Sequence, residues 1–145
     1  MELVLNQFGV TDTKGRVLNP DKGFRYDVKN AGADALVVGD CVKIKSVAGA
    51  KTICVEKIAE TTDTVFGMVQ YESAGAATYA TGKMLTVAAD YSIVTCEASG
   101  AIAAGAEVEA VIAGQKVATK TTGTAIGTAL TSAAAAGDLI LVKLG

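Results

Sequence analysis

The sequence contains no histidine and no tryptophan, and only 5 % of its 145 residues are aromatic. Histidine is the commonest general base, the usual partner of a nucleophilic serine or cysteine, and the commonest metal ligand. Its absence lowers the expectation of an enzyme without excluding one. No aromatic residue follows Tyr91, so the C-terminal third must pack with small aliphatic side chains. Few large side chains are left there to line a ligand pocket.

Cysteine is also scarce, and charge of one sign is not concentrated anywhere. The three cysteines, at positions 41, 54 and 96, are odd in number and lack CxxC spacing. Cys41 and Cys54 lie on predicted strands, so we expect them to be free buried thiols, in a protein from a reducing compartment with no zinc site. The formal net charge is −2 with both signs mixed along the chain, and no basic stripe is present. This pattern disfavours binding to nucleic acid.

Long apolar runs and targeting signals are missing as well. The first residues lack a basic region followed by a long apolar stretch, so no signal peptide is evident. No apolar run approaches the roughly 20 residues needed to cross a bilayer. We expect a soluble protein with no membrane partner. A chain of 145 residues fits one domain, which would bury roughly two-thirds of its unfolded surface.

The motifs of cofactor and metal chemistry are not found either. The aspartates do not have the spacing of an EF-hand loop, and no glycine-rich loop joins a strand to a helix. Lys83-Met84 lacks the flanking residues of a biotinyl or lipoyl lysine. Asp63 and Glu72 flank one predicted strand, but nothing marks them as an acid–base pair. We expect no catalytic residue, no cofactor and no metal.

What the sequence does contain is a repeated pattern of glycine followed by alternating apolar and polar residues. It occurs at residues 39–44, 82–87, 105–111 and 137–144, and apolar strands centred on glycine lie between the members of each pair, at 65–69 and 125–130. The glycine suits a turn with positive φ before a strand. In the first copy, Val42 and Ile44 should face a core while Lys43 and Lys45 face water.

We interpret this order as an internally duplicated all-β domain; the alternative is that a small β protein simply reuses glycine turns. Strands of four to seven residues at this spacing predict a small barrel or sandwich without a long helix. Phe66 is the best candidate for a core aromatic residue, Tyr79 is a candidate to cover a barrel end, and a hairpin is expected around Ala113-Gly114. Asp40 and Asp138 occupy the same place in the repeated pattern, so they should make the same Asx-type turn bond.

The first residues differ from the rest of the chain. Residues 1 to about 37 contain the only proline and both arginines. Leu3 and Leu5 alternate weakly, as in a short strand, and Phe24 and Tyr26 alternate with charged residues. Two interpretations stay open: an edge hairpin that closes the barrel, or an extended arm that docks on a neighbouring molecule. Residues 1–26 are thus predicted as arm or edge hairpin, and 27–145 as the barrel domain.

With this repeat in view, the chain resembles the cement, or head decoration, proteins of tailed bacteriophages. The resemblance rests on the order and spacing of short pieces between residues 27 and 144, and residues 1–26 have no part in it. The pieces are Asp27-Val28-Lys29-Asn30-Ala31-Gly32-Ala33-Asp34-Ala35, Gly39-Asp40-Cys41-Val42-Lys43-Ile44, Phe66-Gly67-Met68-Val69, Ala101-Ile102-Ala103-Ala104-Gly105-Ala106-Glu107-Val108, Ala125-Ile126-Gly127-Thr128-Ala129-Leu130 and Ala136-Gly137-Asp138-Leu139-Ile140-Leu141-Val142.

The resemblance implies a small antiparallel β-barrel of the β-tulip kind with an extended N-terminal arm. It also implies a place in the virion, on the outer surface of the expanded phage head, after synthesis in the host cytoplasm. There the protein would cement neighbouring subunits of the major capsid protein in an HK97-type shell against the pressure of packaged DNA. Homotrimers are common in that family, so self-association as a homotrimer is implied.

Such a role would use the apolar residues of the N-terminal region. An apolar arm can add a strand to an exposed sheet edge of a neighbour, with main-chain hydrogen bonds providing affinity. The expected capsid or subunit contact residues are Leu3, Leu5, Phe8, Phe24 and Tyr26. Two other classes of protein are alternatives. One is a phage tail or fibre domain that contacts another virion protein or a host surface, and the other is a small-barrel enzyme or ligand carrier. The mostly small and polar loops count against the first, and the missing histidine and tryptophan against the second.

Overall fold

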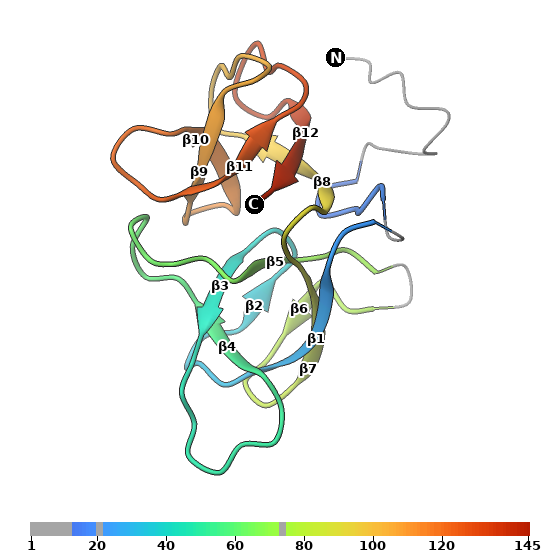
Figure 1. Cartoon of the computed structure of the whole chain (residues 1–145), viewed down its shortest axis with the longest axis vertical. Helices are drawn as coiled ribbons and strands as arrows, with labels where there is room; N and C mark the ends of the chain where they lie inside the picture. Colours follow the sequence, from blue (N-terminus) through green and yellow to red (C-terminus); the bar gives the residue numbers. More distant parts are fainter. Residues whose placement is uncertain (1–12, 20–21, 73–74) are drawn as a thin grey trace.

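The chain folds into two small β-barrels that lie end to end, as the computed structural model of residues 13–19, 22–72 and 75–145 shows (Figure 1). No helix occurs among these described residues. The twelve strands are β1 Arg25–Asn30, β2 Leu36–Val37, β3 Cys41–Ile44, β4 Cys54–Lys57, β5 Gly67–Val69, β6 Thr78–Tyr79, β7 Met84–Ala88, β8 Ile93–Ala98, β9 Glu107–Val111, β10 Lys116–Thr119, β11 Ala125–Ala129 and β12 Leu139–Leu144.

The two barrels have the same strand order. Barrel one closes in the order β1-β4-β3-β5-β7, and barrel two in the order β8-β10-β9-β11-β12. The registers agree as well: Gly67 of β5 pairs with Val42 of β3, and Gly127 of β11 pairs with Val108 of β9. The small β2–β6 sheet also has a counterpart, the isolated bridge between Ile102 and Ala133. The predicted internal duplication is therefore confirmed, and each repeat closes a barrel of its own.

Local geometry follows the sequence pattern closely. The four glycines that open the repeated pattern, Gly39, Gly82, Gly105 and Gly137, have φ of 95°, 90°, 89° and 93°, and each precedes a strand. This backbone region is open to glycine because it has no Cβ. The predicted hairpin around Ala113-Gly114 joins β9 and β10. One detail of the predicted pairing is wrong: β1 pairs with β4, and β8 with β10, in parallel, so neither barrel is purely antiparallel.

The prediction for the two turn aspartates is correct in part. Asp40 accepts a hydrogen bond from the Val37 amide at 2.7 Å, and Asp138 accepts one from the Ala135 amide at 3.2 Å. Both bonds run back to the amide three residues earlier, whereas an Asx turn runs forward. The two positions are not equivalent in the repeat, because Asp40 precedes β3 while Asp138 precedes β12, the counterpart of β7.

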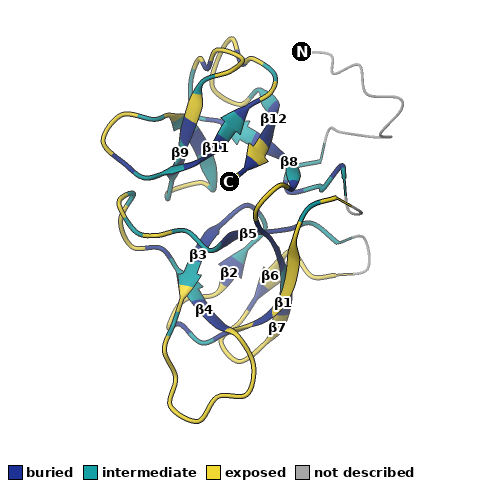
Figure 2. Ribbon diagram, viewed as in Figure 1, coloured by how far each residue is buried: buried dark blue, intermediate teal, exposed yellow. Residues whose placement is uncertain are grey.

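One hydrophobic core fills barrel two and continues across the junction into barrel one. Buried segments occur in both barrels and between them (Figure 2). Barrel one contributes Cys41, Ile58, Met68 and Ala88 to a cluster whose other buried members belong to barrel two. Barrel one has a second cluster of its own, with Val28, Leu36, Val42, Val55, Val69, Tyr79, Leu85 and Val87. Tyr79 is thus the buried aromatic residue of this barrel, while Phe66, the predicted one, is only partly buried against the cluster.

Residues 13–19 lie along the edge of β8, with a turn from Thr13 to Arg16 followed by a short paired stretch around Val17. Val17 and Val94 form an antiparallel bridge. The Gly15 amide donates to the Thr95 carbonyl at 2.8 Å, and the Leu18 amide donates to the Ile93 carbonyl at 2.9 Å. The Asn19 side chain completes the edge by accepting from the Ile93 amide at 2.6 Å. This part of the N-terminal region therefore pairs with barrel two of its own chain.

Candidate docking groove

The N-terminal half of β1 carries two exposed aromatic side chains, Phe24 just before the strand and Tyr26 within it. Alternate strand residues point to one face, so Tyr26 follows the direction of the buried Val28. At Tyr26 the barrel wall is open, because β4 pairs with β1 only at Lys29 and Asn30. The aromatic residues therefore lie at an open seam of barrel one.

This seam is a groove of about 500 Å³. Tyr26 and Phe66 face each other across it with ring centroids 5.1 Å apart, and Phe24 lies 5.8 Å from Tyr91 at one end. Ile44 of β3 is 54 % exposed on its wall. The lining residues are Phe24, Tyr26, Lys43, Ile44, Thr64, Val65, Phe66, Ala89 and Asp90.

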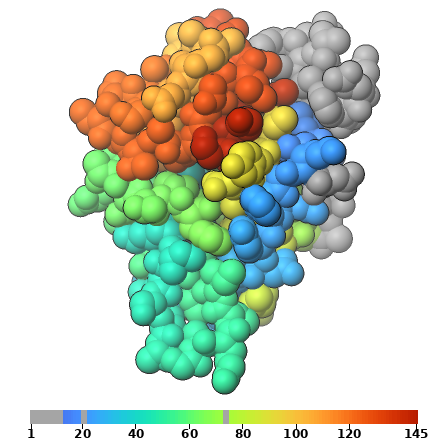
Figure 3. Space-filling view, viewed as in Figure 1, coloured from blue at the N-terminus to red at the C-terminus, as the bar shows by residue number. Residues whose placement is uncertain are grey.

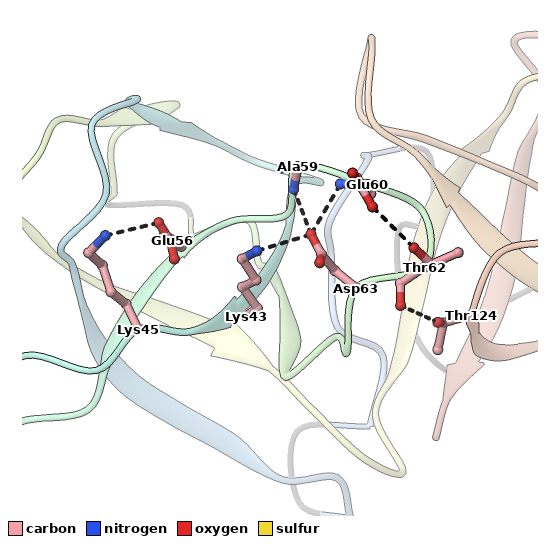
Figure 4. Close-up of polar contacts among 8 residues, drawn as sticks. All are labelled: Lys43, Lys45, Glu56, Ala59, Glu60, Thr62, Asp63 and Thr124. Carbon is pink, nitrogen blue, oxygen red and sulfur yellow. Dashed lines mark hydrogen bonds and ion pairs between the residues drawn. The ribbon is translucent and has the colours of Figure 1, made fainter.

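The charge of Lys43 in the groove is balanced by the neighbouring loop (Figure 4). The Lys43 ammonium donates to Asp63 Oδ2 at 3.1 Å, and the same oxygen accepts from the Ala59 and Glu60 amides at 2.8 and 3.1 Å. These amide hydrogen bonds, together with Lys43, hold the pKa of the Asp63 carboxyl below its usual value. The loop is fixed to barrel two because the Thr124 hydroxyl donates to the Thr62 carbonyl at 3.0 Å. Lys43 is therefore paired with an opposite charge, and most of the other residues that line the groove are apolar.

A second exposed feature is the β3–β4 loop at the far end of barrel one. Residues 46–53 are all exposed, and they include the apolar Val47 and Ile53. In the space-filling view this loop forms the narrow end of the molecule (Figure 3). It lies away from barrel two and is therefore accessible for contact with another molecule.

The structure brings together only some of the residues expected from the sequence. Phe24 and Tyr26 lie in the groove, while Leu3, Leu5 and Phe8 fall outside the described residues. The prediction that Ile44 faces the core is wrong: it points along the same face as the fully buried Val42, but the barrel wall has ended there. Alternation in the sequence indicated the correct face of β3 but not that this face is exposed at Ile44 among the described residues. Phe66 also lines the groove, because it too lies where the barrel wall ends.

The three cysteines are buried and free, which confirms the prediction for Cys41 and Cys54. Burial raises the pKa of the Cys41 thiol to about 12, with the Asp40 carboxylate adding to the shift, and burial also raises the pKa of Cys96. The Cys96 thiol lies 3.8 Å from the Met68 sulfur, in the core that joins the barrels. These thiols fill space as small apolar groups.

We expect none of the three thiols to react with a thiol reagent such as DTNB while the protein is folded, because all three are buried. At Cys41 and Cys96, burial also disfavours the thiolate, which is the reactive form. Absorbance should rise only on addition of denaturant and then report three thiols. Rapid reaction of a native thiol at pH 8 would contradict the burial of these residues.

Two aspartates predict a loss of stability in acid. Hydrogen bonds from the Ala134 and Ala135 amides lower the pKa of Asp138. The pKa of Asp63 is lowered mainly by hydrogen bonds from the Glu60 and Ala59 amides. A carboxyl whose pKa is lower in the folded state stabilises the fold above its unfolded pKa, about 4. That contribution disappears as the pH falls through the lower folded pKa. The unfolding temperature should therefore decrease as the pH falls below 4. The decrease should be less steep in the double variant Asp63→Asn/Asp138→Asn. Equal slopes of unfolding temperature against pH in the wild type and the variant would refute this.

Residues 13–19, 22–72 and 75–145 contain no group of three or more histidine, cysteine, aspartate or glutamate residues that could hold a metal ion. Within that same part of the chain, no helix is long and apolar enough to cross a membrane. The groove is therefore the candidate recognition site.

Comparison with known proteins gives a likeness of fold. No family model matches the sequence, and no curated protein matches it either. Among solved structures, the chain is similar to the head fiber gp8.5 N base of bacteriophage phi29. The TM-score is 0.53 with 14 % sequence identity, and the match covers 84 % of this chain and 93 % of the other. At this identity the comparison establishes a shared fold.

Proposed function

We propose that this protein is a structural component of a phage virion that binds the outside of the expanded head. There it cements neighbouring subunits of the major capsid protein. The observation that carries the proposal is the fold, since the two-barrel chain matches most of a phage head fiber base. The ordered sequence pieces that resemble head decoration proteins support the same role.

The physical character of the chain suits a mechanical role. Closed barrel walls and a core shared between the barrels make a rigid body, which loses little conformational entropy on docking. A protein bound at many equivalent sites on a shell also gains from avidity, so each contact can be modest. Exposed apolar residues are available for such contacts, at Phe24, Tyr26, Ile44, Val47, Ile53, Met84, Tyr91 and Leu130.

The test is co-sedimentation of the purified protein with undecorated heads of the phage that encodes it. We expect saturable binding to expanded heads and none to unexpanded heads, because the cement role requires a site created by expansion. Decorated heads should also survive heating or osmotic shock that breaks bare heads. Absence of binding to either form would refute the proposal.

A second candidate function is the base of a fibre, and the description of the similar structure favours it. Both functions predict binding to heads, but only cementing predicts a gain in head stability. Heads that bind the protein at saturation without becoming more resistant to heat would support the fibre base.

A further inference from the structure

Each groove residue has a counterpart in barrel two, because the two barrels share their strand registers. Tyr26 corresponds to Val94, Ile44 to Ala110, and Phe66 to Ile126. All three counterparts are buried, with at most 6 % of their surface exposed. In barrel one, by contrast, Tyr26 is 36 % and Ile44 54 % exposed. The same position is therefore covered in barrel two, where we call it the joint, and is an open groove in barrel one.

Two parts of the chain close the joint in barrel two. The first is barrel one itself, since Val94, Ala110 and Ile126 belong to the same buried cluster as Cys41 and Met68. The second is the segment 13–19, whose Val17 forms an isolated bridge with Val94. This apolar residue is partly buried and packs against the cluster.

The backbone edge shows the same contrast. On β8, the amides and carbonyls of Ile93 and Thr95 all bond to the segment 13–19. The corresponding residues of β1 are Arg25 and Asp27, and both are exposed. Among the described residues, no strand pairs with this edge of β1 before Lys29. An unpaired strand edge beside an apolar groove is a template for an added strand.

A second copy cannot fill the groove with its own barrel two in the way that barrel one fills the joint. At the junction, the residues of barrel one that pack against barrel two are Cys41, Ile58, Met68 and Ala88. The counterparts of these residues in barrel two are Glu107, Lys120, Thr128 and Lys143. Three of the four are charged, and burying them without partners would be costly. The occupant must therefore be an extended apolar segment.

We propose that residues 1–12 of a second copy add a strand to the edge of β1 and place apolar side chains in this groove. Leu3 and Leu5 have the alternation of such a strand. The region that follows them, residues 13–19, already adds to the equivalent edge of barrel two. In barrel one, a leucine would then lie opposite Tyr26, as Val17 lies opposite Val94 in barrel two.

The position of residue 13 favours a second copy over the same chain. Lys14 forms an ion pair with Glu97 at 2.8 Å and donates to the Gly114 carbonyl at 3.2 Å. Asn19, at the other end of the segment, donates to the Tyr91 carbonyl, next to the groove residue Asp90. Residues 1–12 therefore leave from the end of the segment that is farther from the groove. An arm passed from each copy to the next is a heterologous contact, which closes into a ring when the rotation allows.

This inference goes beyond the proposed function and does not depend on it, because it concerns the purified protein alone. The experiment compares full-length variants by sedimentation velocity over a concentration series. The arm variant is Leu3→Asp/Leu5→Asp, and the groove variant is Ile44→Lys. The matched control is Met84→Lys, since Met84 is 50 % exposed and lies outside the groove. All these changes are at exposed or arm positions, and unfolding temperatures will verify that each variant folds.

We expect the wild type and the control to associate, and the arm and groove variants each to lose at least about tenfold in association constant. A mixture of the arm and groove variants should recover a heterodimer, because one supplies an intact groove and the other an intact arm. In the wild-type assembly, the Arg25 and Asp27 amides should exchange slowly with deuterium.

Several outcomes would overturn the proposal. A monomeric wild type with protected Arg25 and Asp27 amides would show that the arm docks within its own chain. A monomeric wild type with rapidly exchanging amides would show that the groove awaits a different partner, such as the capsid. Failure of the two variants to complement each other would also refute exchange of arms.

Discussion

Replacement of Asn30 by aspartate is expected to lower the free energy of unfolding by about 3–4 kcal/mol. The Asn30 side chain is fully buried and makes three hydrogen bonds. Its amide donates to the Asp34 carbonyl at 2.9 Å and to the Tyr79 carbonyl at 3.0 Å, and its oxygen accepts from the Gly32 amide at 3.1 Å. A carboxylate cannot donate, so Asn30→Asp would bury a charge against two carbonyl oxygens. Urea unfolding at pH 7 measures the loss.

Two comparisons separate the charge from the lost hydrogen bonds. Asn30→Ala should cost less, about 2–3 kcal/mol, because it leaves the three partners unsatisfied without adding a charge. The deficit of Asn30→Asp should also shrink at pH 4, where protonation of a buried carboxyl restores one donor. Two variants within about 1 kcal/mol of the wild type would mean that Asn30 does not organise this end of the barrel.

Alanine at either of two equivalent glycines should also be strongly destabilising. A Cβ on Gly67 would meet the Ala88 carbonyl oxygen at 2.6 Å, and a Cβ on Gly127 would meet the Lys143 carbonyl oxygen. Ala88 and Lys143 occupy the same place in the two repeats. Because the obstacle is backbone in a closed barrel, relief requires a shift of the neighbouring strand. We expect about 2–3 kcal/mol for each substitution, or roughly 10 °C in the unfolding temperature.

The control is Gly100→Ala, since a Cβ there meets no atom within 4 Å. It should change the unfolding temperature little. Differential scanning calorimetry of the three variants tests the idea, and an effect at Gly100 as large as at Gly67 and Gly127 would remove the steric explanation.

The sequence was sufficient for the features that depend on local chemistry. A glycine at positive φ followed by alternating residues predicted β3, β7, β9 and β12, because turn geometry and strand alternation are properties of neighbouring residues. The glycines of β5 and β11 likewise marked the duplication, and the structure explains them by the close approach of the next strand.

The features set by long-range pairing could not be predicted in this way. The parallel β1–β4 seam joins Lys29 to Cys54, and neither residue carries a local sign of it. Ile44 has the same alternation as Val42, and its exposure follows only from where the barrel wall ends. The pairing of residues 15–18 with β8 was missed because Arg16, Val17 and Leu18 do not alternate. Of the groove, the sequence therefore predicted Phe24 and Tyr26 but neither Ile44 nor Phe66.

The segment along β8 has a consequence for the order in which the chain matures during synthesis. Asn19 bonds to Ile93, a residue 74 positions later in the chain. All five strands of barrel one lie between them, so this barrel can close while barrel two is still on the ribosome. The face of barrel one that carries Cys41 and Met68 remains uncovered until barrel two emerges, and the segment 13–19 can pair only after β8 has been synthesised. A nascent chain halted before β8 would therefore expose the apolar face of barrel one that barrel two normally covers. We expect aggregation to be most pronounced in the interval between synthesis of the two barrels.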